Sequence, residues 1–347
     1  MNYEPLDRLP IIAIEPYEQS VIQRWRREGL SPDESPESFF GLDRFDFVPI
    51  NFSPIPGFDC RVISEDDQYV VQLDWLGSTV RRRKEAPSMY YGHIDHPIKT
   101  RRDWESYRER FVPNLAERLP TDWGTETIRR LNQSDNPVGL FPFPFFFRLG
   151  FYAMGMERFL TAFYEEPDLI HDIFSFWADF VCRLIEPVLQ DVKVDFLLLA
   201  EDLAYKTSTH ISPRIYAEFW HPHQDPVIQL ARRYGVPLIV MWTSGNHEPL
   251  LNDMIEHGFN CTWPLERQAG LDARQLRKRY GRCLRLGGNI AKEAAIAGPA
   301  AIDREIERLA PVIHDGGFLP ALDDMVPEEV PFSHYKHLID RLRALEV

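Results

Sequence analysis

Five short apolar segments in the second half of the chain each end abruptly at small, acidic or amide residues. They span residues 194–200, 236–242, 259–263, 283–286 and 318–322. Continuous apolarity, in place of alternation, predicts strands that are covered on both faces, as in parallel sheets flanked by helices. Because ligands of such folds bind at the carboxyl ends of the strands, the polar residues after these segments mark the expected site.

Helical spacing separates the apolar segments and extends the pattern in both directions. We expect helices at 156–164, 167–189, 212–234, 248–257, 273–280, 292–297, 299–315 and 331–345, and a further strand at 138–147. Strands and helices that alternate in this way predict an α/β fold with a parallel sheet. No GxGxxG segment follows the first strand, which weakens the doubly wound alternative and favours a single (β/α)8 TIM barrel.

Residues 1–130 lack this rhythm and are rich in proline, arginine and aromatic residues. We interpret them as an N-terminal elaboration packed on the barrel, with the main βα repeats at 131–347 and one structural domain overall. Apolar residues at helical spacing predict helices at 17–29 and 102–119. Pro113 is expected to kink or split the second of these helices.

The charge balance limits the classes of partner. The chain has 39 basic and 53 acidic side chains, a formal charge of -14, which repels nucleic acid and anionic membranes. No apolar run approaches the ~20 residues of a membrane helix, and the N-terminus lacks the apolar core of a signal peptide. The four cysteines show no CxxC pairing, which predicts free thiols in a reducing compartment. We therefore expect a cytoplasmic protein, and the sequence leaves a homodimer open.

Six short segments, in a fixed order, resemble those of a known family. They are residues 5–10 (PLDRLP), 74–77 (DWLG), 96–100 (HPIKT), 201–206 (EDLAYK), 287–290 (GGNI) and 316–318 (GGF). Together they resemble the uroporphyrinogen decarboxylase superfamily, which also contains the cobamide-dependent methyltransferases. The resemblance covers the chain from about residue 5 onward. It implies a (β/α)8 barrel whose active site lies at the carboxyl ends of the strands.

The branches of this superfamily differ in the residues that their chemistry needs. Uroporphyrinogen decarboxylases resemble one another through an N-terminal Arg-Gln-Ala-Gly-Arg segment that grips carboxylates, and this chain has no such segment near its start. The thiol-methylating branch holds zinc with a His-x-Cys pair and a later Cys. Trp242, Ser244 and the Asp323-Asp324 pair stand at those positions here. Because His and Cys are the usual zinc ligands, a thiol-activating zinc site is not expected.

The resemblance to the remaining, O-demethylase-like branch implies a methyltransferase. Such an enzyme passes a methyl group from a small, for example methoxy-aromatic, donor to a corrinoid on a partner protein. Cleavage of an ether requires the departing oxygen to be protonated or held by a Lewis acid. We expect Glu201, Asp202 and Asp324 to be catalytic, and Glu201 or Asp324 to be the ligand if a metal is present. Since neighbours on a strand point to opposite faces, only one of Glu201 and Asp202 faces the mouth, and we expect Glu201.

Further residues near the strand ends are candidates for substrate binding. They are Phe145, Phe147, Tyr205, Lys206, Trp242, Ser244, Asn246, His247, Glu266, Asn289 and Asp323. Each has a structural alternative: aromatic rings fill barrel cores, Asn and Ser favour turns, and lysines lie on solvated surfaces. Two other functions stay open. One is decarboxylation of a tetrapyrrole or aromatic acid at the same mouth, and the other is a non-catalytic barrel that binds a tetrapyrrole or a partner subunit.

Overall fold

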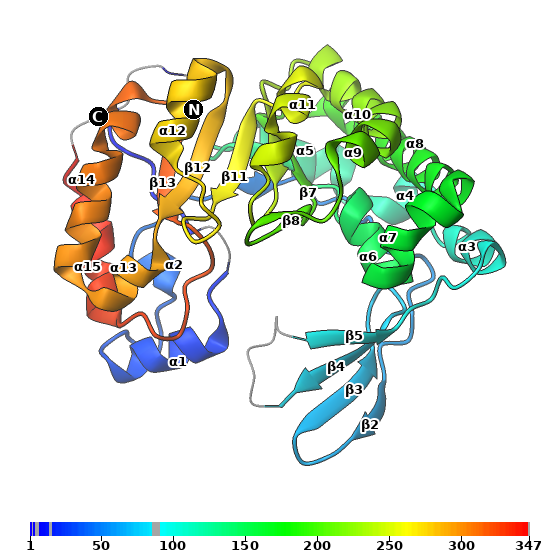
Figure 1. The fold of residues 1–347 in the computed structure, drawn as a ribbon, viewed down its shortest axis with the longest axis horizontal. Coiled ribbons are helices and arrows are strands. Elements are labelled where there is room, and N and C mark those ends of the chain that lie inside the picture. The colour runs from blue at the N-terminus through cyan, green and yellow to red at the C-terminus, as the bar shows by residue number, and fades with distance from the viewer. Residues whose placement is uncertain (2, 4–6, 14–15, 85–90, 346–347) are drawn as a thin grey trace.

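A curled sheet of seven parallel strands forms the centre of the protein (Figure 1). The computed structural model describes residues 1, 3, 7–13, 16–84 and 91–345. The strand order is β1 (Asp46–Phe47), β6 (Val138–Leu140), β7 (Phe196–Ala200), β10 (Leu238–Trp242), β11 (Cys261–Leu265), β12 (Arg285–Ile290) and β13 (Phe318–Leu322). The five predicted apolar segments are therefore all strands of one parallel sheet. Within the described residues no ladder joins β13 to β1, so the expected closed eight-stranded barrel is not confirmed.

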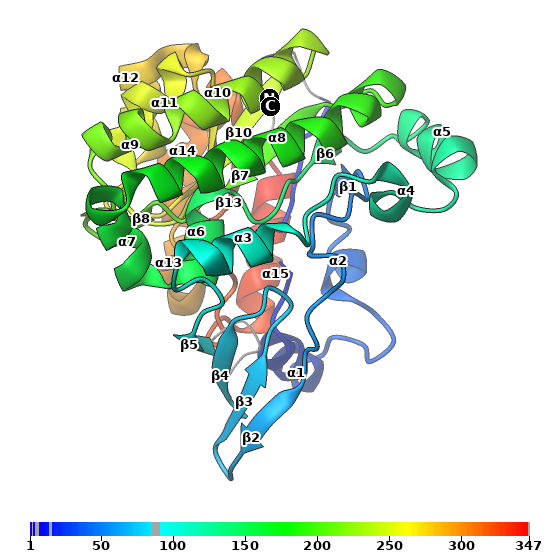
Figure 2. The ribbon, with the colours of Figure 1, turned by 90° about the vertical axis from the view of Figure 1, so that its right-hand side faces the viewer.

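Helices cover the outer face of the sheet between successive strands (Figure 2). They are α6 (Phe146–Met154), α7 (Met156–Glu165), α8 (Pro167–Asp191), α9 (Pro213–Phe219), α10 (His221–Arg233), α11 (Leu251–Glu256), α12 (Ala273–Tyr280), α13 (Lys292–Ala297), α14 (Pro299–Asp315) and α15 (Phe332–Arg343), with 3-10 turns η2 (Glu248–Leu250) and η3 (Gly281–Cys283). These bounds follow the predicted helices closely. No helix in the described ranges is long and apolar enough to span a membrane.

The predicted strand at 138–147 is wrong beyond Leu140. β6 ends there, and the chain turns at two prolines before α6 begins at Phe146. Pro142 and Pro144 have no backbone N–H to donate to a neighbouring strand, so a continuous run of apolar residues cannot continue the ladder. The aromatic block therefore contributes one short strand and the start of a helix.

Side chains of the sheet alternate between an inner and an outer layer. Phe196 and Leu198 of β7 pack with Val240 in a small inner cluster. Their neighbours Leu197 and Leu199 belong to the large cluster beneath the helices. This alternation is the period of two that a strand imposes, and it decides on which side the residues after each strand lie.

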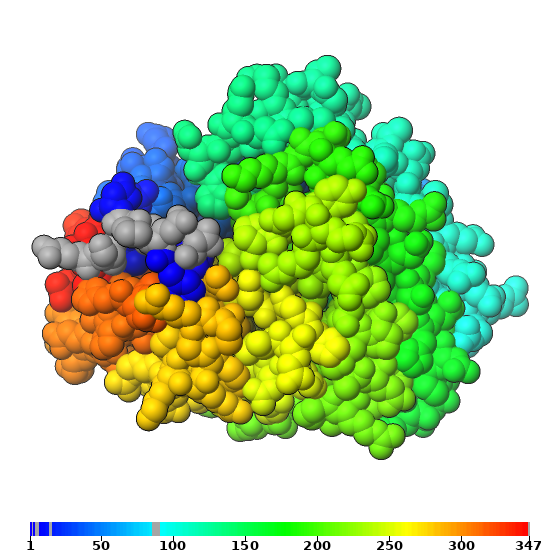
Figure 3. Space-filling view, turned by 90° about the horizontal axis from the view of Figure 1, so that it is seen from above, coloured from blue at the N-terminus to red at the C-terminus, as the bar shows by residue number. Residues whose placement is uncertain are grey.

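The N-terminal region packs on the C-terminal helix α15 through its first part. It contains α1 (Gln19–Arg27), α2 (Pro36–Phe39), α3 (Arg101–Arg108), α4 (Leu115–Arg118), the π turn η1 (Trp123–Thr127) and α5 (Ile128–Asn132). The Trp25 indole donates to the Val330 carbonyl at 2.9 Å, so the first and last parts of the chain lie side by side (Figures 1 and 3). The segment around Pro113 separates α3 from α4, which is the split expected there.

A four-stranded antiparallel sheet, which we call the arm, was not expected from the sequence. Its strands are β2 (Val62–Glu65), β3 (Tyr69–Leu73), β4 (Thr79–Arg83) and β5 (Tyr91–Asp95), in that spatial order. The arm projects from the main body on the side of α6 and α7 (Figures 1 and 2). Ser78 Oγ donates to the Tyr152 carbonyl of α6, and the His96 ring nitrogen Nδ1 lies 2.8 Å from the same oxygen. The base of the arm is thereby fixed to a helix that follows a strand of the parallel sheet.

Candidate active site at the carboxyl ends of the strands

Glu201, directly after β7, lies on the helix side of the sheet and is fully buried. Its Oε1 accepts a hydrogen bond from the Trp220 indole at 2.7 Å, and its Oε2 accepts one from the Phe147 backbone amide at 2.6 Å. Burial raises the pKa of the Glu201 carboxyl to about 8, although both donors act in the opposite direction. The expectation that Glu201 faces the mouth is wrong, because the residue continues the outer row of Leu197 and Leu199.

Asp202 occupies the mouth instead. Its backbone has φ of 87°, and its Oδ2 lies 2.9 Å from Nη2 of Arg148, with 37% of the Asp202 side chain exposed. Burial still raises the pKa of this carboxyl, and the Arg148 charge opposes that shift. Arg148 comes from α6 and also donates to the Tyr152 hydroxyl at 3.0 Å. One of the two adjacent acids therefore supports the fold, and the other meets the opening.

The end of β10 repeats this division of roles. Thr243 is buried, and its hydroxyl accepts the Leu203 amide at 2.8 Å, which fixes the loop after β7. The next turn faces the mouth, where the Gly245 amide donates to Oε1 of Glu266 at 3.0 Å. Burial raises the pKa of Glu266, the Gly245 hydrogen bond lowers it, and the negative charge of Asp324 raises it further. Ser244 also bonds to Glu266 and so helps to orient this carboxyl.

The end of β13 shows the same arrangement once more. Asp323 is buried, and its two oxygens accept the backbone amides of Arg267 at 2.8 Å and Lys292 at 2.9 Å. Burial raises the pKa of Asp323 to about 6. Asp324 is partly exposed and forms an ion pair with the Lys292 ammonium group. Asp323 therefore joins two loops, while Asp324 contributes a paired charge to the mouth.

Three carboxyl groups from three strand ends thus converge on the mouth. Asp324 raises the pKa of both Asp202 and Glu266 through its charge, which places all three within electrostatic reach of one another. Arg148 and Lys292 each pair with one of these acids. Neither cation was among the predicted site residues. Arg148 directly follows the predicted strand 138–147, and Lys292 begins the predicted helix 292–297.

Partly exposed aromatic rings line the inner side of the strands next to these acids. Trp242 and Trp263 are register partners at the ends of β10 and β11. Phe141 stacks on Trp242 with ring centroids 6.2 Å apart, and it also contacts Phe143 at 5.3 Å. Trp75, at the base of the arm, stacks on Phe143 at 6.3 Å. The rings form a continuous aromatic row from the inside of the sheet to the arm.

Several predicted substrate-binding residues lie away from the mouth. Phe145 is buried against Phe146, and Phe147 is buried between Phe159 and the His210 ring, so neither offers an open aromatic surface. His247 is buried on the helix side, where its Nε2 lies 2.7 Å from the Thr262 hydroxyl. These side chains occupy the outer layer because the chain leaves the strand geometry before it reaches them.

Asn289 is the clearest departure from the expected turn chemistry. β12 continues through it, and its side chain is fully buried. Its Nδ2 donates to the carbonyls of Leu265 and Leu271, and its Oδ1 accepts the Ala273 amide at 3.0 Å. Asn289 therefore ties the loop after β11 to the next strand and does not face a ligand.

The remaining candidates lie at the rim. Tyr205 belongs to a short hairpin, β8 (Ala204–Tyr205) and β9 (Ser208–Thr209), and is 48% exposed. Its carbonyl accepts a hydrogen bond from the Asn246 amide at 2.9 Å, while Lys206 Nζ donates to Gln268 Oε1 at 3.4 Å. The Asn246 side chain accepts the Glu248 amide, which is ordinary turn bonding.

No three His, Cys, Asp or Glu side chains in the described part of the chain are arranged to hold a metal ion. Glu201 uses both oxygens for hydrogen bonds, and Asp324 is held by Lys292. The residues at the positions of the family's zinc ligands, Trp242 and Ser244 among them, offer no soft donor. The site as built does not fit a zinc ion, and we derive no step through one.

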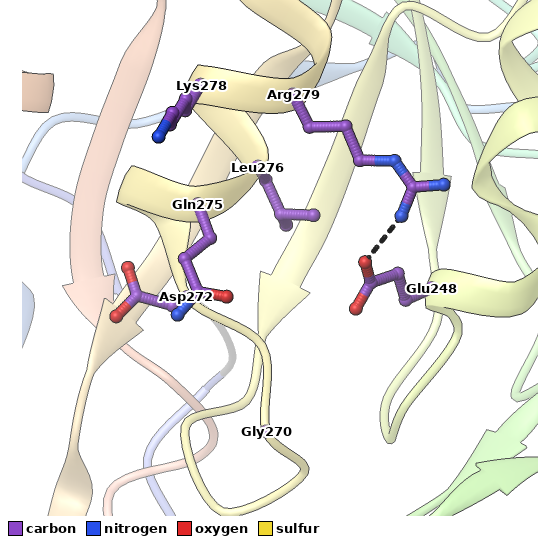
Figure 4. Close-up of a pocket in the computed structure, with 7 residues that line it drawn as sticks. All are labelled: Glu248, Gly270, Asp272, Gln275, Leu276, Lys278 and Arg279. Carbon is purple, nitrogen blue, oxygen red and sulfur yellow. Dashed lines mark hydrogen bonds and ion pairs between the residues drawn. The ribbon is translucent and has the colours of Figure 1, made fainter.

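A separate hollow of about 430 Å³ lies on the outer surface between η2 and α12 (Figure 4). Its lining residues are Glu248, Gly270, Asp272, Gln275, Leu276, Lys278 and Arg279. Glu248 pairs with Arg279 at 2.8 Å, and Asp272 accepts the Arg274 amide at the start of α12. Asp272 also forms ion pairs with Arg267 and Arg308, which lie outside the lining, and none of the mouth residues lines this hollow. We therefore place the candidate site at the mouth.

Comparison with known proteins agrees with this fold. No curated protein sequence matches the chain. A methyltransferase from Methanosarcina mazei has a similar structure, with a TM-score of 0.60 and 16% sequence identity over 98% of this chain and 94% of that one. The sequence profile of the family described as uroporphyrinogen decarboxylase (URO-D) matches residues 68–345, which is most of the chain. The protein therefore belongs to the uroporphyrinogen decarboxylase family.

Proposed function

We propose that the protein is a methyltransferase that moves a methyl group from a small methoxy-aromatic donor to a corrinoid carried by a partner protein. The observation that carries this proposal is the position of Glu266. It is a half-buried carboxyl group with a raised pKa, and it directly follows β11, the strand that carries Trp263 of the aromatic row. Among the described residues it forms no ion pair, unlike Asp202 and Asp324. Burial of a carboxyl group favours its protonated form, which is the form that a general acid needs.

Demethylation of an aryl ether needs that proton. The methyl carbon–oxygen bond breaks and its electron pair stays on the oxygen. The methyl group passes to the reduced corrinoid, which would supply the electron pair of the new bond to the methyl carbon. Glu266 donates its proton to this oxygen, so that a neutral phenol departs in place of a phenolate, and the carboxylate is then reprotonated from solvent. General acid catalysis of this kind contributes about 10²–10⁴-fold to a rate.

The other groups of the mouth are assigned positioning roles. The Asp202–Arg148 and Asp324–Lys292 pairs hold their charges in fixed places, and Asp324 keeps the pKa of Glu266 raised. Trp242, Trp263 and Phe141 offer flat apolar surface to an aromatic ring, which stacks favourably on such side chains. The fold shared with a methyltransferase supports this reading.

The test measures methyl transfer to reduced cobalamin, free and protein-bound, from a panel of methoxy-aromatic compounds. We expect transfer with at least one donor. Glu266→Gln should lower kcat about 10²-fold or more with guaiacol or anisole. With 4-nitroanisole the loss should be much smaller, because nitrophenolate leaves without a proton. An equal loss for both donors would contradict the role of Glu266 as the acid.

Decarboxylation remains the second candidate, because the family description names it. A substrate with several carboxylates needs several convergent cations. The two cations found at the mouth, Arg148 and Lys292, are each already paired with an acid of the chain. Release of carbon dioxide from an aromatic acid or a tetrapyrrole, without any corrinoid, would favour this alternative. Ligand binding without turnover in either assay would favour a non-catalytic protein.

A further inference from the structure

The aromatic block after β6 divides into two parts that differ in exposure. The rings of residues 145–147 are buried, whereas Phe141 and Phe143 are partly exposed. Phe141 stacks on Trp242 with centroids 6.2 Å apart, and it contacts Phe143 at 5.3 Å. Aromatic rings gain much from burial, so partly exposed rings that contact one another beside a site indicate a surface that a ligand covers.

The aromatic row extends from the sheet to the base of the arm. Phe143 stacks on Trp75 with centroids 6.3 Å apart and an interplanar angle of 27°. The Arg148 guanidinium lies 5.5 Å from the Phe143 centroid, and Arg148 also pairs with Asp202. The middle of the row is therefore tied to the acids of the mouth, and the row runs along the mouth from β10 to the arm.

Trp75 is presented by a turn that is fixed by its own hydrogen bonds. The turn joins β3 to β4, and the amides of Leu76 and Ser78 donate to Oδ1 of Asp74 at 3.0 and 2.8 Å. Leu76 and Ser78 are buried, and the Ser78 hydroxyl donates to the Tyr152 carbonyl of α6. The Trp75 ring, which stays partly exposed, therefore has a set position at the end of the aromatic row.

The candidate acid lies at the other end of the row. Glu266 directly follows β11, and Trp263 of that strand pairs in register with Trp242. In the proposed reaction the ether oxygen meets Glu266, so the ring that carries it lies at the Trp242 end. A benzene ring contacts rings whose centroids lie within about 7 Å of its own. Three successive contacts, of 6.2, 5.3 and 6.3 Å, separate Trp242 from Trp75, so a one-ring donor leaves Trp75 uncovered.

We propose that Trp75 is a specificity-determining residue, which selects methoxy-aromatic donors that carry a second aromatic ring. The first ring places its ether oxygen at Glu266, and the second ring reaches Phe143 and Trp75. This inference rests on the proposed function and adds the size and shape of the donor. Trp75 takes no part in bond breaking, and it binds the second ring alike before and during the reaction. Its loss therefore acts on KM more than on kcat.

The test compares guaiacol with 4-phenylguaiacol, which keeps the reacting ring and adds a second one. The wild type should show a KM for 4-phenylguaiacol at least tenfold below that for guaiacol. A third donor, 4-cyclohexylguaiacol, has similar bulk but a saturated ring that cannot stack, so its KM should fall less.

Three variants locate the preference. Trp75→Ala should remove most of the preference for 4-phenylguaiacol, and Trp75→Phe, which keeps a flat ring, should retain most of it. The matched control is Trp123→Ala, which removes a partly exposed indole from η1, outside the aromatic row. It should leave the preference unchanged. Because the preference is a ratio of two KM values for one protein sample, a partly misfolded variant does not alter it.

A binding measurement separates this inference from the proposed function. The demethylated products, catechol and 4-phenylcatechol, can be titrated by calorimetry without a corrinoid. The wild type should bind 4-phenylcatechol at least tenfold more tightly than catechol, and Trp75→Ala should lose most of this difference. If the wild type transfers no methyl group but shows this binding pattern, the proposed function fails and the site for the second ring stands.

Two results would overturn the role of Trp75. One is a wild type that uses or binds the one-ring and two-ring compounds equally well. The other is an equal effect of Trp75→Ala on both compounds. If methyl transfer from guaiacol still occurs in either case, the proposed function stands without a site for a second ring.

Discussion

Adjacent polar residues at the strand ends have different roles, depending on the side of the sheet on which they lie. Glu201, Thr243 and Asp323 are buried and accept hydrogen bonds from backbone or indole N–H groups. The residues that follow two of them, Asp202 and Asp324, are partly exposed and pair with cations at the mouth. The residue directly after each of these strands supports the loops, whereas the acids that follow Glu201 and Asp323 are open to a ligand at the mouth.

This contrast changes how acidic strand ends are interpreted. A buried carboxyl group with a strongly raised pKa is a common sign of a catalytic residue. Here the pKa of Glu201 is raised to about 8, but both oxygens of this carboxyl group accept hydrogen bonds within the fold. The geometry therefore has to be considered before the pKa, and it favours Glu266, Asp202 and Asp324 as the reactive set.

The largest expected effect on stability is that of Glu201→Ala. It leaves the Trp220 indole and the Phe147 amide without their acceptor in a buried site. We expect a loss of about 2–4 kcal/mol in the free energy of unfolding. Asp202→Ala, at the exposed position next to it, should cost about 1 kcal/mol or less. Urea denaturation of both variants checks this, and equal losses would remove the distinction between the two positions.

The second prediction compares the other acidic pair. Asp323→Ala removes the acceptor of two backbone amides and should cost about 1–3 kcal/mol. Asp324→Ala breaks a partly exposed ion pair and should cost about 1 kcal/mol or less. Only Asp324→Ala should act on the mouth chemistry, by lowering the pKa of Glu266 and moving the alkaline limb of the pH–rate profile to lower pH. An unchanged pH–rate profile would show that the charge of Asp324 does not act on the pKa of Glu266.

The third prediction concerns the dependence of stability on pH. The pKa of Glu201 is about 8 in the folded protein, so the folded state keeps a proton that the unfolded chain releases above about 4.3. Stability is therefore lost as the pH rises toward 8, by at most about 1.4 kcal/mol per pH unit. Glu201→Gln, which does not titrate, should have a flatter profile. Asp323, with a pKa of about 6, acts mostly below that value, and the histidines are the same in both proteins. The difference between wild type and Glu201→Gln in urea denaturation between about pH 6.5 and 8 therefore reports Glu201.

The smallest effect is expected at the rim. Lys206 is exposed, and its Nζ donates a long hydrogen bond, of 3.4 Å, to Gln268. Lys206→Ala should change the free energy of unfolding by less than about 0.5 kcal/mol. It should also leave methyl transfer within twofold of the wild type. A large loss of turnover would show that the substrate extends to the hairpin of β8 and β9, which would widen the mouth beyond its three acids.

The positions of the individual side chains were harder to predict than the elements that carry them. Glu266 and Asp202 could be proposed from their place after apolar runs, but Arg148 and Lys292 could not, because a cation in the first turn of a helix has no local signature of a site. Asn289 looked like part of a turn, since it follows two glycines, yet β12 continues through it and buries its amide. The arm was missed because its strands are short and mostly exposed, so their alternation is weak.

The sequence by itself determined the order of the parallel strands from β6 to β13 and of the helices from α7 to α15, because continuous apolar runs and helical spacing are local properties of the chain. It did not predict α6 or the hairpin of β8 and β9. It also determined that polar groups gather at one end of the sheet. The tertiary structure alone decided which of two adjacent acids faces the mouth, which cations pair with them, and that the arm lies beside them. These features depend on where the chain leaves strand geometry and on contacts between residues far apart in the sequence.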